Sequence, residues 1–198
     1  MLYWILRLII FWILKVIFRI QIFGRQHLPR KGGFILAGNH TSYLDPVVLG
    51  VACPRRLDFM AKEELFRNPL FSGLLSQVGA FPVKRNSADL SALKEAMRRL
   101  KQGNGLALFP EGSRRFDGAS TQPHAGIGFL TAKLNVPVIP AFIRGTDLAL
   151  PKGAKFIRRP VRICVYFGKE ISIEKNSAYQ DIARTIMTNI RQLEKNSW

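Results

Sequence analysis

Cysteine and histidine are scarce in this chain of 198 residues, which contains two cysteines and three histidines. The cysteines, Cys53 and Cys164, lie far apart in the sequence. This separation excludes a disulfide scaffold and a zinc module, and it suits a reducing compartment. The histidines are scattered and show no spacing typical of metal ligands, so we expect no metal site.

Acidic residues are also few, 13 against 30 lysines and arginines, which gives a formal net charge of +17. Hydrophobic residues nevertheless make up 47% of the chain, and this excludes a disordered basic tail. So large a positive charge on a foldable chain indicates a polyanionic partner: nucleic acid, an anionic membrane or a phosphorylated substrate. We expect no nucleic-acid binding, because the cations are dispersed and no known nucleic-acid motif accompanies them.

A long uncharged stretch is missing near the amino terminus, although residues Met1–Phe23 are strongly apolar. The longest uncharged run in this segment, Leu8–Leu14, is far shorter than the ~20 residues that span a bilayer. On a helix the cations of the segment fall within one arc of about 120°. They are Arg7, Lys15 and Arg19. A wide apolar face with bordering tryptophans is typical of a helix in the membrane interface, and a tilted span with snorkelling cations is the alternative.

From Gly32 onward, short apolar runs alternate with amphipathic stretches. Six runs are predicted to be strands: Gly33–Ala37, Leu57–Ala61, Ala80–Lys84, Leu106–Phe109, Val138–Ile143 and Val161–Phe167. Helices are predicted at Pro46–Ala52, Leu90–Leu100 (capped by Asn86 or Ser87), Ile127–Leu134 and Tyr179–Leu193. The alternation predicts an α/β fold with a mixed, largely parallel central sheet flanked by helices. We divide the chain into an amphipathic anchor, residues 1–24, and a folded domain, residues 25–198.

A histidine and an aspartate lie close together just after the first predicted strand of the domain. His40 and Asp45 are five residues apart, so on one regular helix their side chains would point ~140° away from each other. They can pair only if His40 lies in a loop and Asp45 begins the next helix. Pro46 favours this arrangement, because proline is well tolerated as the first helical residue. The pair would suit a general base, although Asp45 could instead merely cap the helix.

Two further strand ends carry charged residues. Lys84 and Arg85 follow one predicted strand, and the sequence from Phe109 to Arg115, Phe-Pro-Glu-Gly-Ser-Arg-Arg, follows another. Its glycine permits close approach of the backbone to a ligand, and its arginines offer planar donors for phosphate. Because the carboxyl ends of parallel strands meet at one edge of a sheet, His40, Arg85 and Glu111 are expected to converge there.

Together these segments resemble the four ordered sequence blocks of the 1-acyl-sn-glycerol-3-phosphate acyltransferase family. The blocks are Asn39–Asp45, Gly79–Arg85, Phe109–Arg114 and Val136–Pro140. The resemblance covers roughly residues 32–168. It implies that His40 is the general base and that Asp45 orients it. It further implies the roles of the remaining candidates: Arg85, Glu111, Gly112 and Arg114, with Lys84 beside them, bind the acceptor phosphate, while Pro137 and Pro140 shape the site and the passage of the acyl donor.

The chain departs from the family pattern at two positions. Ser113 stands where threonine is frequent, which keeps the hydroxyl. His124 and Ala125 precede Gly126 where many members carry a lysine. This second departure leaves open whether His124 replaces a cationic contact and which headgroup is preferred.

The expected reaction is transfer of an acyl group from a thioester, acyl-carrier protein or acyl-CoA, to the hydroxyl of a lysophospholipid, foremost 1-acyl-sn-glycerol-3-phosphate. No cofactor is expected beyond this co-substrate. A covalent acyl-enzyme is not expected, because the chain has no Gly-x-Ser-x-Gly elbow. We expect the protein to bind an anionic membrane on the cytoplasmic face of the inner membrane of a bacterium, through residues 1–24. A different lysolipid acceptor and a non-catalytic protein that binds anionic lipid are the alternatives.

Overall fold

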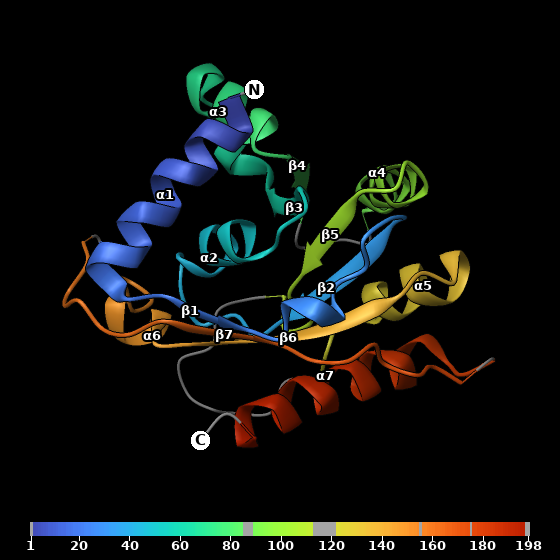
Figure 1. Ribbon diagram of the computed structural model, residues 1–198. Coiled ribbons are helices and arrows are strands. Elements are labelled where there is room, and N and C mark those ends of the chain that lie inside the picture. The colour runs from blue at the N-terminus through green and yellow to red at the C-terminus, as the bar shows by residue number, and fades with distance from the viewer. Residues whose placement is uncertain (1, 85–88, 113–121, 155, 175, 197–198) are drawn as a thin grey trace.

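The computed structural model describes residues 2–84, 89–112, 122–154, 156–174 and 176–196. These residues form an α/β fold around a seven-stranded sheet (Figure 1). The strands are β1 (Gln21–Phe23), β2 (Phe34–Gly38), β3 (Leu57–Lys62), β4 (Ala80–Val83), β5 (Gly105–Leu108), β6 (Val138–Arg144) and β7 (Cys164–Phe167). They are arranged in the order β1-β7-β6-β2-β5-β3-β4.

Five neighbouring strands of this sheet, β6, β2, β5, β3 and β4, run parallel to one another. Strand β7 is antiparallel to β6, and β1 is parallel to β7, so one end of the sheet has the opposite direction. The predicted mixed, largely parallel sheet is therefore confirmed. The carboxyl ends of the five parallel strands all open on one edge, where ligands bind in folds of this kind.

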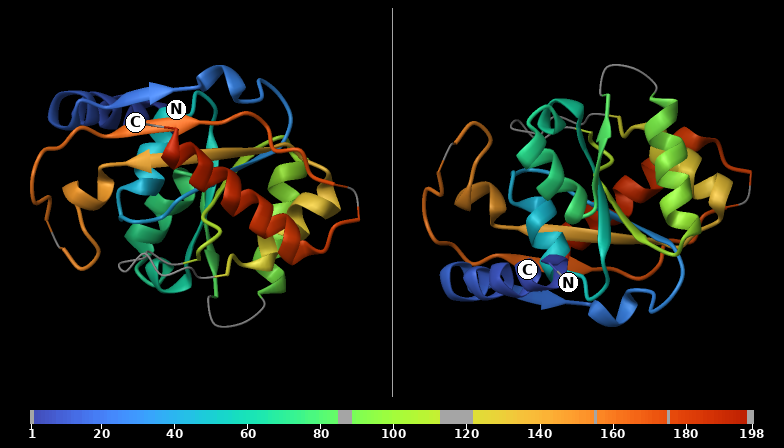
Figure 2. Two further views of the ribbon diagram at one scale, coloured as in Figure 1. Left: turned by 90° about the horizontal axis from the view of Figure 1, so that it is seen from below. Right: turned by 90° about the horizontal axis from the view of Figure 1, so that it is seen from above.

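Helices cover both faces of the sheet. The α-helices are α1 (Leu2–Phe18), α2 (Asp45–Ala52), α3 (Pro69–Gln77), α4 (Leu90–Lys101), α5 (Ala125–Leu134), α6 (Thr146–Ala149) and α7 (Tyr179–Lys195), with short 3-10 turns η1 (Arg25–His27) and η2 (Glu63–Phe66). One buried cluster joins the sheet to α1 and α2, and a second joins it to α4, α5 and α7. In the right-hand view of Figure 2, α2 and α3 lie on one side of β3 and β4, and α4 lies on the other.

The six predicted strands and four predicted helices of the domain are present, with shifts of a few residues at their ends. The largest shift is in β7, which begins at Cys164 and not at Val161. The predicted cap of α4 is wrong. The carboxylate of Asp89 accepts from the N–H groups of Ser91 and Ala92 at 3.1 and 3.0 Å, so the helix begins later than Asn86 or Ser87 would place it.

Three helices or strands were not predicted from the sequence, β1, α3 and α6, and the last has four residues, too few to show a period. Strand β1 lies within the segment assigned to the anchor, and it pairs with β7 at the edge of the sheet. Helix α3 has nine residues and buries none of them, so its apolar spacing is too short to distinguish from other short apolar runs. The first 23 residues thus supply both a helix and a strand to the fold.

Helix α1 is docked on the domain by one of its sides. Leu14 and Phe18 are 3% and 1% exposed and belong to the same buried cluster as α2. Arg7 also faces this interior side. Its guanidinium donates to the carbonyls of Gly50, Val51 and Cys53 at 3.2, 3.0 and 2.9 Å. Arg7 is therefore not part of a solvated cationic face, because the carboxyl-terminal end of α2 attracts its positive charge.

The opposite side of α1 is apolar and open. Its exposed side chains are Trp4, Ile5, Leu8, Ile9, Trp12, Ile13, Val16 and Ile17. Within the described part of the chain, no helix reaches the combination of length and hydropathy that a membrane crossing requires.

Candidate active site

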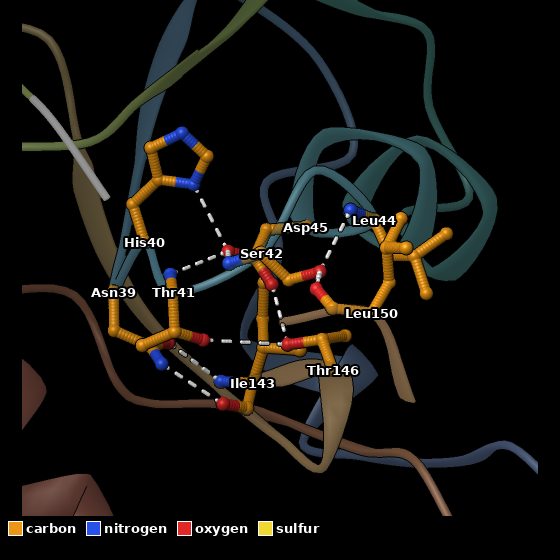
Figure 3. A network of polar contacts seen from close by, with 9 residues as sticks. All are labelled: Asn39, His40, Thr41, Ser42, Leu44, Asp45, Ile143, Thr146 and Leu150. Atoms are coloured by element: carbon orange, nitrogen blue, oxygen red, sulfur yellow. Dashed lines mark hydrogen bonds and ion pairs between the residues drawn. The ribbon is translucent and has the colours of Figure 1, made fainter. Parts of the chain in front are cut away.

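The candidate site lies where strand β2 ends and the chain turns into α2. Residues 39–44 form the connecting loop, and Asp45 is the first residue of the helix with Pro46 directly after it. Asp45 is fully buried and His40 is 8% exposed, which is unusual for side chains of this polarity. Burial on this scale requires hydrogen-bonding partners, and Figure 3 shows them.

His40 and Asp45 are paired as predicted. The Nδ1 atom of His40 lies 2.9 Å from Oδ2 of Asp45. The same carboxylate oxygen accepts from the backbone N–H groups of Thr41 and Ser42 at 2.7 and 2.8 Å. Because Oδ2 already accepts from two backbone donors, the hydrogen between the two side chains is assigned to Nδ1 of His40. In the neutral imidazole, Nε2 then carries the lone pair that a general base requires.

The second oxygen of Asp45 is held by a residue distant in sequence. The Thr146 hydroxyl donates to Oδ1 at 2.6 Å, and Thr146 is fully buried at the start of α6. The carboxylate is thus fixed through both oxygens and cannot rotate away from His40. Thr146 was not among the predicted site residues.

Side-chain contacts also fix the loop that carries His40. The amide of Asn39 donates to the carbonyl of Ile143 at 2.9 Å and accepts from its N–H at 2.7 Å, so it joins the loop to β6. The hydroxyl of Ser42 donates to the Leu150 carbonyl at 2.7 Å. These contacts tie β2, β6 and the segment after α6 together around the histidine (Figure 3).

The imidazole of His40 rests on the ring of Phe109, with the ring centroids 4.2 Å apart and the planes inclined by 21°. Phe109 directly follows β5, the parallel neighbour of β2. The register pairs Ala37 with Leu108, which brings the predicted Glu111 block next to the histidine loop. The prediction that these two strand ends converge is therefore confirmed.

Glu111 lines a pocket of about 440 Å³ together with Asn39 and Thr41, the two neighbours of His40. On its other side the pocket is bounded by α7, through Met187, Ile190, Arg191 and Glu194, and by the segment after β6, through Asp147, Pro151 and Lys152. The cavity thus combines apolar walls with charged groups beside the paired side chains. This is the composition of a site that holds an amphiphilic ligand.

Gly112 has a left-handed backbone conformation with φ of 66°, which strongly favours glycine. A side chain at this position would overlap the imidazole of His124. The backbone N–H of His124 donates to the Pro110 carbonyl at 2.9 Å, so this histidine belongs to the Glu111 block in space.

Of the three cations predicted to bind the acceptor phosphate, Lys84 is the one that the structure describes. Lys84 follows β4 and is exposed, with its ammonium 4.0 Å from the Glu63 carboxylate. Strand β4 is three positions away from β2, so Lys84 shares the carboxyl edge of the sheet with His40 but lies about 14 Å along it. Arg85 and Arg114 lie outside the described residues.

Pro140 lies within β6 and Pro137 lies directly before it, and neither is at the edge that carries His40. Pro140 is buried within the strand opposite Ala37, three residues before His40. Pro137 precedes the strand, and its carbonyl accepts from the N–H of Ile35 at 2.9 Å. Pro137 therefore lies at the far end of the strand from the paired side chains.

Cys53 and Cys164 are both buried, as expected for core residues. Burial raises the pKa of the Cys53 thiol, which disfavours the thiolate that a nucleophile needs. Within the described ranges, no group of three or more histidine, cysteine, aspartate or glutamate side chains is placed to hold a metal ion.

Comparison with known proteins agrees with this architecture. A family model described as Acyltransferase matches residues 19–144, which include His40, Asp45 and Glu111. A 1-acyl-sn-glycerol-3-phosphate acyltransferase of Bacillus subtilis is 31% identical over 127 residues, covering 64% of this chain and 63% of the relative. The enzyme of the same name from Streptococcus pneumoniae is 29% identical over 169 residues, covering 82% of this chain and 61% of the relative. The chain thus spans less than two thirds of the length of either relative.

Among solved structures, the 1-acyl-sn-glycerophosphate acyltransferase PlsC of Thermotoga maritima superposes with a TM-score of 0.72. The match covers 95% of this chain and 81% of the other, at 22% sequence identity. It shows that the two chains share a fold.

Proposed function

The chain belongs to the Acyltransferase family, and from this premise we propose that it transfers a fatty acyl group to the hydroxyl of a lysophospholipid. The proposed acceptor is 1-acyl-sn-glycerol-3-phosphate and the product is phosphatidic acid, as the names of the similar proteins suggest. The donor is an acyl thioester, acyl-carrier protein or acyl-CoA, and no further cofactor takes part. The observation that carries the proposal is the buried pair of His40 and Asp45, with Nε2 of the histidine available as a base.

In the proposed mechanism, Nε2 of His40 takes the proton from the acceptor hydroxyl as its oxygen attacks the thioester carbonyl. An ester C–O bond forms and the C–S bond breaks. The leaving thiolate then recovers the proton from the imidazolium. Asp45 holds the ring through Nδ1 and stabilises the positive charge that develops on it. Transfer is direct, so no acyl group becomes attached to the protein.

The acceptor phosphate is proposed to bind the cations of the second and third blocks. Arg85 and Arg114 provide planar, bidentate donors, and Lys84 adds a charge at the same edge of the sheet. Glu111 and Gly112 shape the loop beside His40, and Pro137 and Pro140 fix the course of β6 beneath it. Holding the phosphate orients the glycerol hydroxyl toward Nε2 and converts a bimolecular encounter into an oriented one.

We further propose that the protein works at the cytoplasmic face of the inner membrane, with residues 1–24 as the attachment. The open side of α1 carries eight exposed aliphatic or aromatic side chains and is flanked by Lys15 and Arg19. Such a face binds the headgroup region of an anionic bilayer through burial of apolar area and attraction of opposite charge.

The decisive experiment is an acyl-transfer assay with acyl-CoA and acyl-carrier protein against a panel of lysolipids, comparing the parent with His40→Ala. We expect lysophosphatidate to be consumed by the parent and the rate to fall by about a hundredfold to ten-thousandfold in the variant. His27→Ala is the matched control, because the Nδ1 atom of His27 contacts the Phe167 carbonyl at 2.9 Å on β7, two strand positions from β2. If another lysolipid is acylated in place of lysophosphatidate, the proposed acceptor is wrong and the proposed mechanism still holds.

Equal rates of acyl transfer by His40→Ala and the parent would show that His40 is not the general base. If no acceptor is acylated while binding to anionic vesicles is intact, the protein is a lipid-binding protein and not an enzyme.

A further inference from the structure

Exposed apolar side chains are distributed unevenly between the two faces of the sheet. On the face covered by α4, α5 and α7, the large apolar residues that the described chain exposes are Leu90 and Tyr179. The face covered by α1, α2 and α3 exposes the eight residues of α1 and a further set. This set comprises Tyr43, Val47, Leu65, Leu70, Phe71 and Leu74. Four more exposed apolar residues lie in β1, in α6 and in the segment after α6, namely Phe23, Leu148, Phe156 and Ile157. A concentration of this kind on one face marks an interaction surface.

Helix α3 contributes most to this set beyond α1. Leu70 is 88% exposed, Phe71 is 49% exposed and Leu74 is 44% exposed. These residues follow the helical spacing i, i+1 and i+4, so they project from one side. The side chain of Asn68 caps the helix by accepting from Leu70 N–H at 3.0 Å and Phe71 N–H at 3.2 Å. The helix is thus well formed, yet its apolar side is left in water.

Helix α3 also adjoins the amino-terminal end of α1. The guanidinium of Arg56 lies 5.2 Å from the centroid of the Tyr3 ring and donates to the Gln77 carbonyl at 3.3 Å. Tyr3 belongs to the first turn of α1, and Gln77 is the last residue of α3. In Figure 1 the amino-terminal end of α1 lies next to α3. The two helices therefore adjoin at one end on the molecular surface.

We propose that α3 is a second membrane-contacting element, whose Leu70, Phe71 and Leu74 side chains enter the headgroup region of an anionic phospholipid bilayer beside α1. The proposal rests on the membrane attachment put forward above and extends it beyond residues 1–24. A bilayer fits this surface because its exposed apolar side chains are accompanied by an excess of cations. Around η2 and α3 the cations Arg56, Lys62, Arg67 and Lys84 outnumber the acidic Glu63 and Glu64, and the whole chain has a net charge of +17.

Contact through two helices would fix the orientation of the protein on the bilayer, whereas a single helix permits rotation about its own axis. Helix α2 lies on the same face of the sheet as α1 and α3 and begins at Asp45. The loop that carries His40 would consequently face the bilayer that contains the lipid acceptor.

The test uses an environment-sensitive fluorophore attached to single introduced cysteines, since the native cysteines are buried. The positions are Leu70→Cys on α3, Ile9→Cys on α1 and Leu90→Cys on α4, the last being 67% exposed on the opposite face and serving as the matched control. Vesicles of phosphatidylcholine mixed with phosphatidylglycerol are added. We expect emission to shift to shorter wavelength for the labels at positions 70 and 9 and to stay unchanged at position 90.

A label at position 70 that behaves like the label at position 90, while position 9 shifts, would overturn the role of α3 and leave α1 as the attachment. If the emission of the label at position 70 shifts without vesicles and the shift grows with protein concentration, α3 binds a second copy of this chain and not a bilayer. If no label shifts, membrane attachment itself is wrong.

A second measurement does not depend on labelling. Leu70→Asp combined with Phe71→Asp is expected to weaken vesicle binding about tenfold or more, and Leu90→Asp to leave it unchanged. Circular dichroism verifies that the exposed substitutions leave the fold intact. Transfer to a water-soluble, short-chain lysolipid should be the same in all these variants, and transfer to acceptor in vesicles should fall with binding. Equal vesicle binding by the parent and the double variant would contradict the proposal.

Discussion

At the scale of single residues, Thr146 is expected to position the catalytic pair. Its hydroxyl donates to Oδ1 of Asp45 at 2.6 Å. Removing the hydroxyl takes this hydrogen bond away from a buried carboxylate oxygen. We predict that Thr146→Val lowers kcat about tenfold and leaves the KM for the acceptor unchanged, because the threonine holds Asp45 and touches no substrate. Thr146→Ser keeps the hydroxyl and should restore the rate. If Thr146→Ser is as slow as Thr146→Val, the hydroxyl alone does not restore the rate, and the prediction for this hydrogen bond is wrong.

The residue scale also shows which parts of the site could be predicted. His40 and Asp45 lie five residues apart, with Pro46 directly after them, so their pairing is encoded in one short stretch. Thr146 is 101 residues from its partner Asp45, and Asn39 is 104 residues from Ile143. Such contacts depend on β2 and β6 being neighbours, and the order of strands in a sheet leaves no local mark in a sequence.

At the scale of secondary-structure elements, predictability followed burial. Helices α4 and α7 bury one side and expose the other, so their apolar residues recur with helical spacing. Helix α3 has nine residues and buries none of them, and β1 has three residues, so neither leaves a period long enough to detect. In α1 the apolar character was visible, but the inward direction of Arg7 was not. That direction is set by the free carbonyls at the end of α2.

We expect Arg7 to join α1 to α2 as a structural element. Arg7→Met removes its hydrogen bonds to three carbonyls and should lower the free energy of unfolding by about 2 kcal/mol, because each such bond involves a charged donor. For a chain of this length the melting temperature should fall by roughly 4–8 °C in thermal unfolding followed by circular dichroism. Lys15→Gln is the control, since Lys15 is exposed on the same helix. An equal loss of unfolding free energy in the two variants would show that the charge of α1 matters and that the contacts of Arg7 with the carbonyls do not.

At the scale of the whole molecule, the charge and the exposed apolar surface are both accounted for by the proposed bilayer. The excess of positive charge was readable from composition, and it predicted a polyanionic partner without saying where on the fold that partner binds. The structure shows that most of the exposed large apolar side chains lie on the face of α1, α2 and α3. An amphiphilic anion satisfies both features, whereas a nucleic acid would leave the apolar side uncovered.

Binding to the bilayer should consequently depend on salt and on lipid charge. We predict that raising the salt concentration from about 0.1 to 1 M weakens binding to anionic vesicles by tenfold or more, because the screening length falls from about 10 to 3 Å. Binding to vesicles of phosphatidylcholine alone should be weaker and nearly independent of salt. Lys15→Gln should weaken anionic binding about fivefold, and Lys133→Gln, an exposed lysine of α5 on the opposite face, should not. Sedimentation with vesicles measures all of these, and equal effects of the two lysine variants would mean that net charge, and not the orientation set by α1 and α3, governs attachment.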